Sequence, residues 1–111
     1  MNQRRFVRIN AELLPEELIA IKLVFPDNLE IESSVVDISP QGLRVAIPPS
    51  DVPVSIPQKN DIIRVFFQAI QLRLTCRCIY SMFIQDSTML MGFYVFDPDE
   101  QCKLREHLDI I

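Results

Sequence analysis

Three arginines stand within five residues near the start of the chain, in the stretch RRFVR from Arg4 to Arg8. A guanidinium group is a rigid fork of N–H donors that binds phosphate oxygens in pairs and stacks on flat rings. Arg4 and Arg8 are four residues apart, so their side chains lie on one side of the chain whether it is extended or helical. Arg5 points the opposite way in an extended chain. The pair can therefore grip one anionic ligand, although a solvated basic terminus has the same pattern.

The second candidate is the hexapeptide DISPQG, from Asp37 to Gly42. Asp37 and Ser39 are two residues apart near the end of a predicted strand, so both side chains project from one face where the chain turns. Gly42 allows a backbone conformation closed to other residues, or the close approach of a ligand. The same hexapeptide is also an ordinary Asx or Ser-Pro turn that ends a hairpin.

Other kinds of chemistry find little support in the sequence. The net charge of -4 argues against a protein that coats nucleic acid with a broad basic surface, so any anion site is local. Cys76 and Cys78 share one face of a predicted strand, and we expect them to be reduced core thiols with no metal. His107 is the one histidine, and there is no Ser-His-acid set or phosphate loop. We expect no enzyme and no cofactor.

The elements that position these residues follow from hydrophobic alternation and turn chemistry. Residues 1–10 hold three arginines and no acid, which predicts a flexible tail. Strands are predicted at 18–25, 29–39, 43–47, 61–67, 71–83 and 89–96. The segment Pro48–Asn60 is rich in proline and predicts a long surface loop.

The end of the chain predicts a helix. Asp97 is a typical cap, Pro98 suits the first position, and acids follow in the first turn. The apolar stripe of this helix, made by Leu104, Leu108 and Ile111, packs on the strands or closes one end of them. Six short strands and one terminal helix favour a single domain over residues 1–111, an antiparallel barrel or sandwich with an appended helix.

The two candidate motifs occur in a fixed order, separated by one strand. RRFVR followed by VVDISPQGLRV resembles the paired signature R-x-x-x-R and D-x-S-x-x-G of the PilZ domain family. The proline-rich loop, the strand MGFYVF and the helix start DPDEQ extend the resemblance over essentially the whole chain. It implies an all-β fold, a six-stranded antiparallel barrel over residues 18–97 with a C-terminal helix at 98–110 and a flexible arginine tail.

PilZ domains are known for binding cyclic di-GMP, a bacterial second messenger with two guanines and two phosphates. The resemblance implies that the arginines of the tail bind phosphate or the O6 and N7 acceptors of guanine, and that Asp37 and Ser39 accept from its N–H edge. The implied ligand-binding residues are Arg4, Arg5, Arg8, Asp37, Ser39 and Gly42, and possible further contacts are Tyr80, Arg44 and Arg77. Tyr80 shares the parity of Cys76 and Cys78, which favours core packing. Gln3, which precedes the first motif arginine, favours one ligand molecule over a stacked pair.

We therefore expect a cytoplasmic receptor for cyclic di-GMP that orders its tail on binding and signals through a partner protein. No nucleic acid and no membrane is expected among its partners, because the surface is not broadly basic and no apolar run can span a bilayer. A monomer or weak dimer is expected. The alternative is a protein-interaction module with the same barrel that does not depend on nucleotide.

Overall fold

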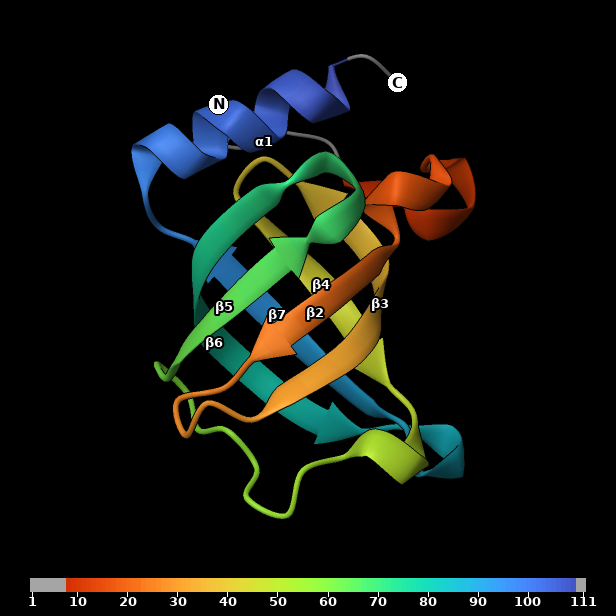
Figure 1. Cartoon of the computed structure of the whole chain (residues 1–111). Coiled ribbons are helices and arrows are strands. Elements are labelled where there is room, and N and C mark those ends of the chain that lie inside the picture. The colour runs from red at the N-terminus through yellow and green to blue at the C-terminus, as the bar shows by residue number, and fades with distance from the viewer. Residues whose placement is uncertain (1–7, 110–111) are drawn as a thin grey trace, which may run out of the picture.

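The computed structural model describes residues 8–109, which form seven β-strands, five short 3-10 turns and one α-helix (Figure 1). The strands are β1 Ile9–Asn10, β2 Ala20–Val24, β3 Glu30–Ser39, β4 Gly42–Ile47, β5 Ile62–Phe67, β6 Leu72–Phe83 and β7 Met89–Val95. The helix α1 is Pro98–Leu108. The 3-10 turns are Ala11–Leu13, Glu16–Leu18, Pro49–Asp51, Gln68–Ile70 and Gln85–Ser87.

Six strands close into an antiparallel barrel, so the barrel interpretation is confirmed and the sandwich is not formed. The order around the barrel is β3-β2-β5-β6-β7-β4, and the pairing of β3 with β4 closes it. Strand β1 is an addition that pairs with the end of β3, with Ile9 opposite Ile38 and Asn10 opposite Asp37. Strand β3 therefore has β2 and β1 along one edge and β4 along the other.

Alternating side chains from all six barrel strands fill the interior. On β6, Leu72, Leu74, Cys76 and Cys78 are buried while Arg73 and Arg77 are exposed, as the sequence predicts. The three thiols of the chain are free, and burial raises the pKa of both Cys76 and Cys78 above the ordinary thiol value. A thiol with a raised pKa remains protonated and packs as an apolar group.

Three predicted elements differ from the structure by two residues at one end, and the other strand boundaries differ by one residue at most. The tail expected over residues 1–10 already ends at β1, because Ile9 and Asn10 pair with β3. Residues 1–7 lie outside the described residues. The strand expected at 18–25 begins at Ala20, since a 3-10 turn precedes it in which the amide of Leu18 donates to the carbonyl of Pro15 at 2.9 Å. The helix expected over 98–110 ends at Leu108, and residues 110 and 111 lie outside the described residues.

The Pro48–Asn60 segment contains no strand, as its prolines predict. It is more than a surface loop, however, because Pro53 and Pro57 are buried and Val52 and Ile56 pack against the core. The segment lies at the end of the barrel opposite α1 (Figure 1).

Helix α1 lies across one end of the barrel (Figure 1), where Leu104 and Leu108 are buried as the stripe predicts. Asp97 caps the helix by accepting from the amide of Asp99 at 2.8 Å. Glu100 joins the helix to β6: its carboxylate accepts from the amide of Thr75 at 2.6 Å and from the hydroxyl of Thr75 at 3.3 Å. Within residues 8–109, no helix has the length and apolar character that a membrane crossing requires.

Replacing Glu100 with alanine should loosen α1 from the barrel, because the backbone amide of Thr75 loses its charged acceptor. We expect the free energy of unfolding to fall by about 2 kcal/mol, the scale of a hydrogen bond to a charged group. The control is Glu106→Ala, an exposed acid of the same helix, with an expected change under about 0.5 kcal/mol. Denaturant unfolding measures both, and equal effects of the two substitutions would contradict the account.

Candidate functional site

A β-bulge in β3 determines which way the second motif faces. Val35 lies opposite Val45 on β4, but the next register pair is Asp37 with Arg44, so Val36 is an extra residue. Val35 and Ile38 are both in the core. Strict alternation would put Asp37 and Ser39 on the core face with Val35, and the bulge turns them to the outer face of the barrel.

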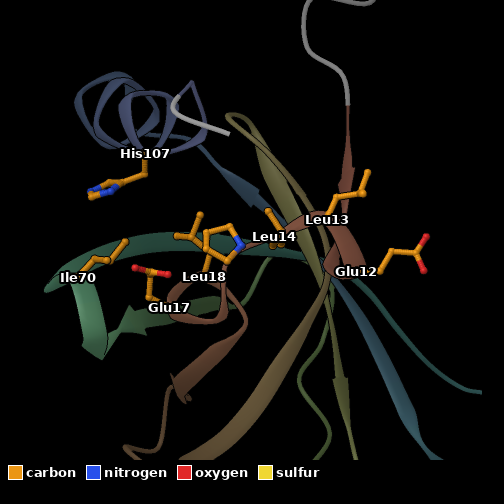
Figure 2. A pocket seen from close by; sticks show the side chains of 8 residues that line it. Glu12, Leu13, Leu14, Glu17, Leu18, Ile70 and His107 are labelled. Atoms are coloured by element: carbon orange, nitrogen blue, oxygen red, sulfur yellow. The ribbon is translucent and has the colours of Figure 1, made fainter.

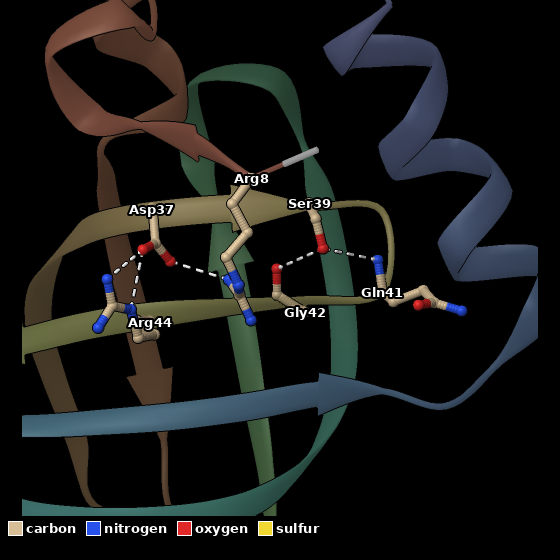
Figure 3. A network of polar contacts seen from close by, with 6 residues as sticks. All are labelled: Arg8, Asp37, Ser39, Gln41, Gly42 and Arg44. Carbon is tan, nitrogen blue, oxygen red and sulfur yellow. Dashed lines mark hydrogen bonds and ion pairs between the residues drawn. The ribbon is translucent and has the colours of Figure 1, made fainter. Parts of the chain in front are cut away.

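Two arginines enclose the carboxylate of Asp37 (Figure 3). The Nη1 atom of Arg8 lies 2.8 Å from Oδ1, and the Nε atom of Arg44 donates to Oδ2 at 2.8 Å, with Arg44 Nη2 on the same oxygen. The Asp37 side chain is 3 % exposed, whereas those of Arg8 and Arg44 are 42 % and 40 % exposed. The three groups together carry one net positive charge on the surface of an acidic chain.

The basic arm and the acidic corner thus meet in space. Arg8 stands directly before β1, and the pairing of β1 with β3 brings it alongside Asp37. Arg4 and Arg5 lie outside the described residues. Hydrogen bonding to Asp37, with a smaller contribution from Tyr80, raises the pKa of Arg44 above its ordinary value, so the guanidinium of Arg44 remains charged at any physiological pH.

Ser39 and Gly42 hold the turn between β3 and β4. The hydroxyl of Ser39 accepts from the amide of Gln41 at 3.3 Å and donates to the carbonyl of Gly42 at 3.5 Å (Figure 3). Gly42 does not have a positive φ. A Cβ atom on Gly42 would lie 2.4 Å from the carbonyl oxygen of Phe93, so glycine is required by the close approach of β7. The expectation of a special backbone conformation at Gly42 was wrong.

Tyr80 faces outward, which corrects its expected place in the core. A second bulge, at Ile79 in β6, separates the pair Cys78–Phe93 from the pair Tyr80–Gly92. The extra residue reverses the parity of the strand. A Cβ atom built on Gly92 would lie 2.4 Å from Cε2 of Tyr80, so the tyrosine ring covers Gly92 on the outer face.

The register aligns these residues in two neighbouring rows across the outside of the barrel. The Asp37 row, in the order of the strands β3, β4, β7 and β6, is Asp37, Arg44, Gly92 and Tyr80. The Gly42 row beside it is Ser39, Gly42, Tyr94 and Arg77. At the end of the Gly42 row, the guanidinium of Arg77 lies over the ring of Phe96, 5.1 Å from its centroid. The rows present cations, aromatic rings and hydroxyl groups on one continuous face.

Comparison with known proteins adds to this geometry. No family model and no curated protein matches the sequence. Solved structures do match, among them Escherichia coli YcgR in complex with c-di-GMP, with a TM-score of 0.63 and 17 % identity over 96 % of this chain and 44 % of that chain. The Bacillus subtilis inhibitor of motility MotI/DgrA matches with a TM-score of 0.69 and 14 % identity, over 98 % and 51 %. The PilZ domain of YcgR with c-di-GMP matches with a TM-score of 0.63 and 16 % identity, over 94 % of this chain and 87 % of that chain.

The chain has the PilZ-domain fold. It spans about half the length of the first two proteins and most of the isolated PilZ domain.

A separate cavity of the PilZ-like barrel has the wrong charge for a phosphate ligand. It has a volume of about 580 Å³ and opens between α1 and the 3-10 turns that follow β1 (Figure 2). Leu14, Leu18 and Ile70 supply its apolar wall, and its two carboxylates, those of Glu12 and Glu17, outnumber its one basic side chain, that of His107. Negative charge repels phosphate, so the outer face with the Asp37 row is the better anion site of the two.

Replacing Gly42 with alanine should destabilise the PilZ-like barrel, because the new methyl group meets a backbone carbonyl that cannot move alone. We expect a loss of about 2 kcal/mol in the free energy of unfolding. In Gly92→Ala the methyl group meets a tyrosine ring, which can rotate away, and a smaller loss of about 1 kcal/mol is expected. The reverse order in denaturant unfolding would show that the approach of β7 is not the constraint on Gly42.

Proposed function

We propose that the chain is a receptor for cyclic di-GMP, which binds on the outer face of the barrel at the Asp37 and Gly42 rows. The observation that carries the proposal is the contact between Arg8 and Asp37, which joins the two sequence motifs on one face. The PilZ fold supports it, since solved structures of neighbours with this fold contain c-di-GMP.

The chemistry of the proposed face suits the two parts of this ligand. Phosphates and the O6 and N7 atoms of guanine are acceptors, which arginine forks bind, and Arg8 is aided in the proposal by Arg4 and Arg5. The opposite edge of guanine donates, and Asp37 is its proposed acceptor. The ring of Tyr80 offers a flat surface for stacking beside Asp37.

The charge of the proposed site favours cyclic di-GMP over a nucleic acid as its ligand. The site holds one buried carboxylate among its arginines, and that carboxylate repels a plain phosphate backbone while it accepts from a base edge. The chain as a whole, at a net charge of -4, does not attract a long polyanion. A small ligand that combines phosphates with guanine suits both the arginines and the carboxylate of the site. The proposed activity is therefore binding and signalling, without catalysis.

The proposed mechanism is an order-disorder switch at the start of the chain. Pairing of β1 with β3 fixes the point at which the arm joins the barrel, next to Asp37. Ligand phosphates on the outer face would draw Arg4 and Arg5 toward the barrel by neutralising their mutual repulsion. In the proposal, a partner protein then recognises the surface made by arm, nucleotide and barrel.

A second candidate is an interaction module that works without nucleotide. It is favoured by three consecutive apolar residues, the last two of β6 and the one after it, Met82, Phe83 and Ile84, whose exposures are 50 %, 56 % and 44 %. Exposed apolar clusters of this kind mark protein contacts. Partner capture that is unchanged by cyclic di-GMP and lost when these three residues become serine would favour this candidate over the first.

Calorimetric titration with cyclic di-GMP tests the proposed function. The wild-type chain should bind saturably, and Arg8→Ala should weaken binding by roughly 10- to 100-fold, the effect of losing a charged hydrogen bond of about 1.5–3 kcal/mol. The control is Arg64→Ala, because Arg64 is an exposed arginine of β5 that contacts Asn28 and lies outside both rows. Absence of saturable heat at high micromolar protein would end the proposal.

Limited trypsin digestion tests the ordering of the arm separately. Saturating cyclic di-GMP should slow cleavage after Arg4, Arg5 and Arg8, because ordered arginines are poor protease sites. Cleavage after Lys59, an exposed residue of the Pro48–Asn60 segment that belongs to neither row, should keep its rate and serves as the internal control. If the ligand binds and all rates stay the same, the arm does not order and only the binding proposal stands.

A further inference from the structure

The oxygen Oδ2 of Asp37 already accepts hydrogen bonds from a side chain of the same chain, that of Arg44. Arg44 directs both Nε and Nη2 at this one oxygen, while Arg8 holds Oδ1 (Figure 3). Arg44 stands directly opposite Asp37 in the β3–β4 register, in the interior of β4. Its guanidinium can therefore leave the carboxylate only by rotation of the side chain, and it returns to the same position by the reverse rotation.

The donor pattern of Arg44 matches that of guanine. The Nε and Nη2 atoms of a guanidinium present two parallel N–H bonds, and the N1 and N2 atoms of guanine present two parallel N–H bonds along the edge opposite O6 and N7. A carboxylate receives such an edge best with both oxygens, one hydrogen bond to each. The edge of guanine therefore needs the oxygen on which Arg44 now lies.

We infer that Arg44 acts as an internal substitute for guanine at Asp37, and that cyclic di-GMP binds by displacing the Arg44 guanidinium from Oδ2. This inference rests on the proposed function and deepens it. Arg44 then competes with the ligand for Asp37, and is not a ligand contact of the kind expected for Arg8. The displaced side chain, 40 % exposed, remains on the outer face between Asp37 and Gly92 of the Asp37 row.

Asp37 itself sets the choice of base. The cost of displacing Arg44 is the same for every ligand that takes Oδ2, so it lowers all affinities by one factor and leaves their ratio unchanged. Guanine offers two donors to the carboxylate, whereas the edge of adenine carries the acceptor N1 beside its amino group, so one of its atoms repels the carboxylate. Arg44 therefore sets the affinity that a ligand needs to hold the site, and Asp37 sets the preference for guanine.

The test compares Arg44→Gln with Arg64→Gln in the full chain. Both substitutions remove one positive charge, but Arg64 is exposed, contacts Asn28 and lies outside both rows. The change in net charge is thus shared, and higher salt screens the remaining long-range attraction for phosphate. The difference between the two variants at high salt reports the contact of Arg44 with Oδ2.

Calorimetry with cyclic di-GMP at 0.15 M and 0.5 M salt varies the screening of charge. At both ionic strengths, Arg44→Gln should bind at least threefold more tightly than Arg64→Gln. Cyclic di-AMP should remain the weaker ligand of both variants, because it lacks the donor edge that Asp37 accepts. Equal or weaker binding by Arg44→Gln would overturn the inference and make Arg44 a ligand contact or a bystander.

Two further measurements keep the outcome unambiguous. If circular dichroism shows that Arg44→Gln does not fold, Arg44→Lys replaces it, because lysine keeps the charge and lacks the parallel pair of donors. The Arg44→Lys variant should bind cyclic di-GMP more tightly than the wild type. Equal or weaker binding by this variant overturns the inference. If wild type and Arg64→Gln both fail to bind cyclic di-GMP, the proposed function is wrong and this inference falls with it. Binding by those two with no gain in the Arg44 variant leaves the proposed function standing and removes only the displacement.

Discussion

The carboxylate of Asp37 is almost fully enclosed although it lies on the outside of the barrel, because Arg8 and Arg44 cover it from two sides. A buried charge is tolerated only where it is paired and hydrogen-bonded. Asp37 therefore constrains both arginines: it fixes the point at which the N-terminal arm meets the barrel, and it holds Arg44 flat on the surface of β4. The two motifs become one site through this single group.

Two β-bulges make that arrangement possible. The extra residue Val36 turns Asp37 outward, and the extra residue Ile79 turns Tyr80 outward. Through β4 and β7 the register then aligns the two side chains in one row, with Gly92 leaving room for the tyrosine ring. Bulges are frequent next to functional sites for this reason, since they re-aim a side chain without ending the strand. Here both bulges turn a side chain toward the same outer face of the barrel.

The sequence predicts the barrel strands and the helix well, because alternation and capping are local signals. The buried positions of β6 from Leu72 to Cys78 and the cap at Asp97 both follow from such patterns. The bulges do not follow, because an inserted valine or isoleucine looks like any other strand residue, and parity counted from Cys78 puts Tyr80 on the wrong face. The need for glycine at position 42 arises from β7, which is fifty residues away along the chain.

The candidate site, like the fold, is predicted from the sequence only in part. The motif spacing predicts that Arg8 and Asp37 act together, and they are in contact. Arg44 is the second partner of Asp37, and the sequence holds a signal for it, since the pairs Ser39–Gly42, Ile38–Leu43 and Asp37–Arg44 follow in regular register from the turn. The register shift lies beyond Asp37, at Val36, and it decides that this pair lies on the outer face of the barrel, which the sequence does not show.

The most direct test of the account is a set of ¹H–¹⁵N correlation spectra recorded while cyclic di-GMP is added to the labelled chain. The account predicts saturable shifts at Arg8, at residues of the Asp37 and Gly42 rows, and at the side-chain Nε–H of Arg44. It predicts unchanged signals on the opposite side of the barrel, at Lys22, Arg64 and Arg73 on β2, β5 and β6. Shifts confined to that opposite side, or none at saturating ligand, would contradict the claim that the arm and the Asp37 corner form a nucleotide site.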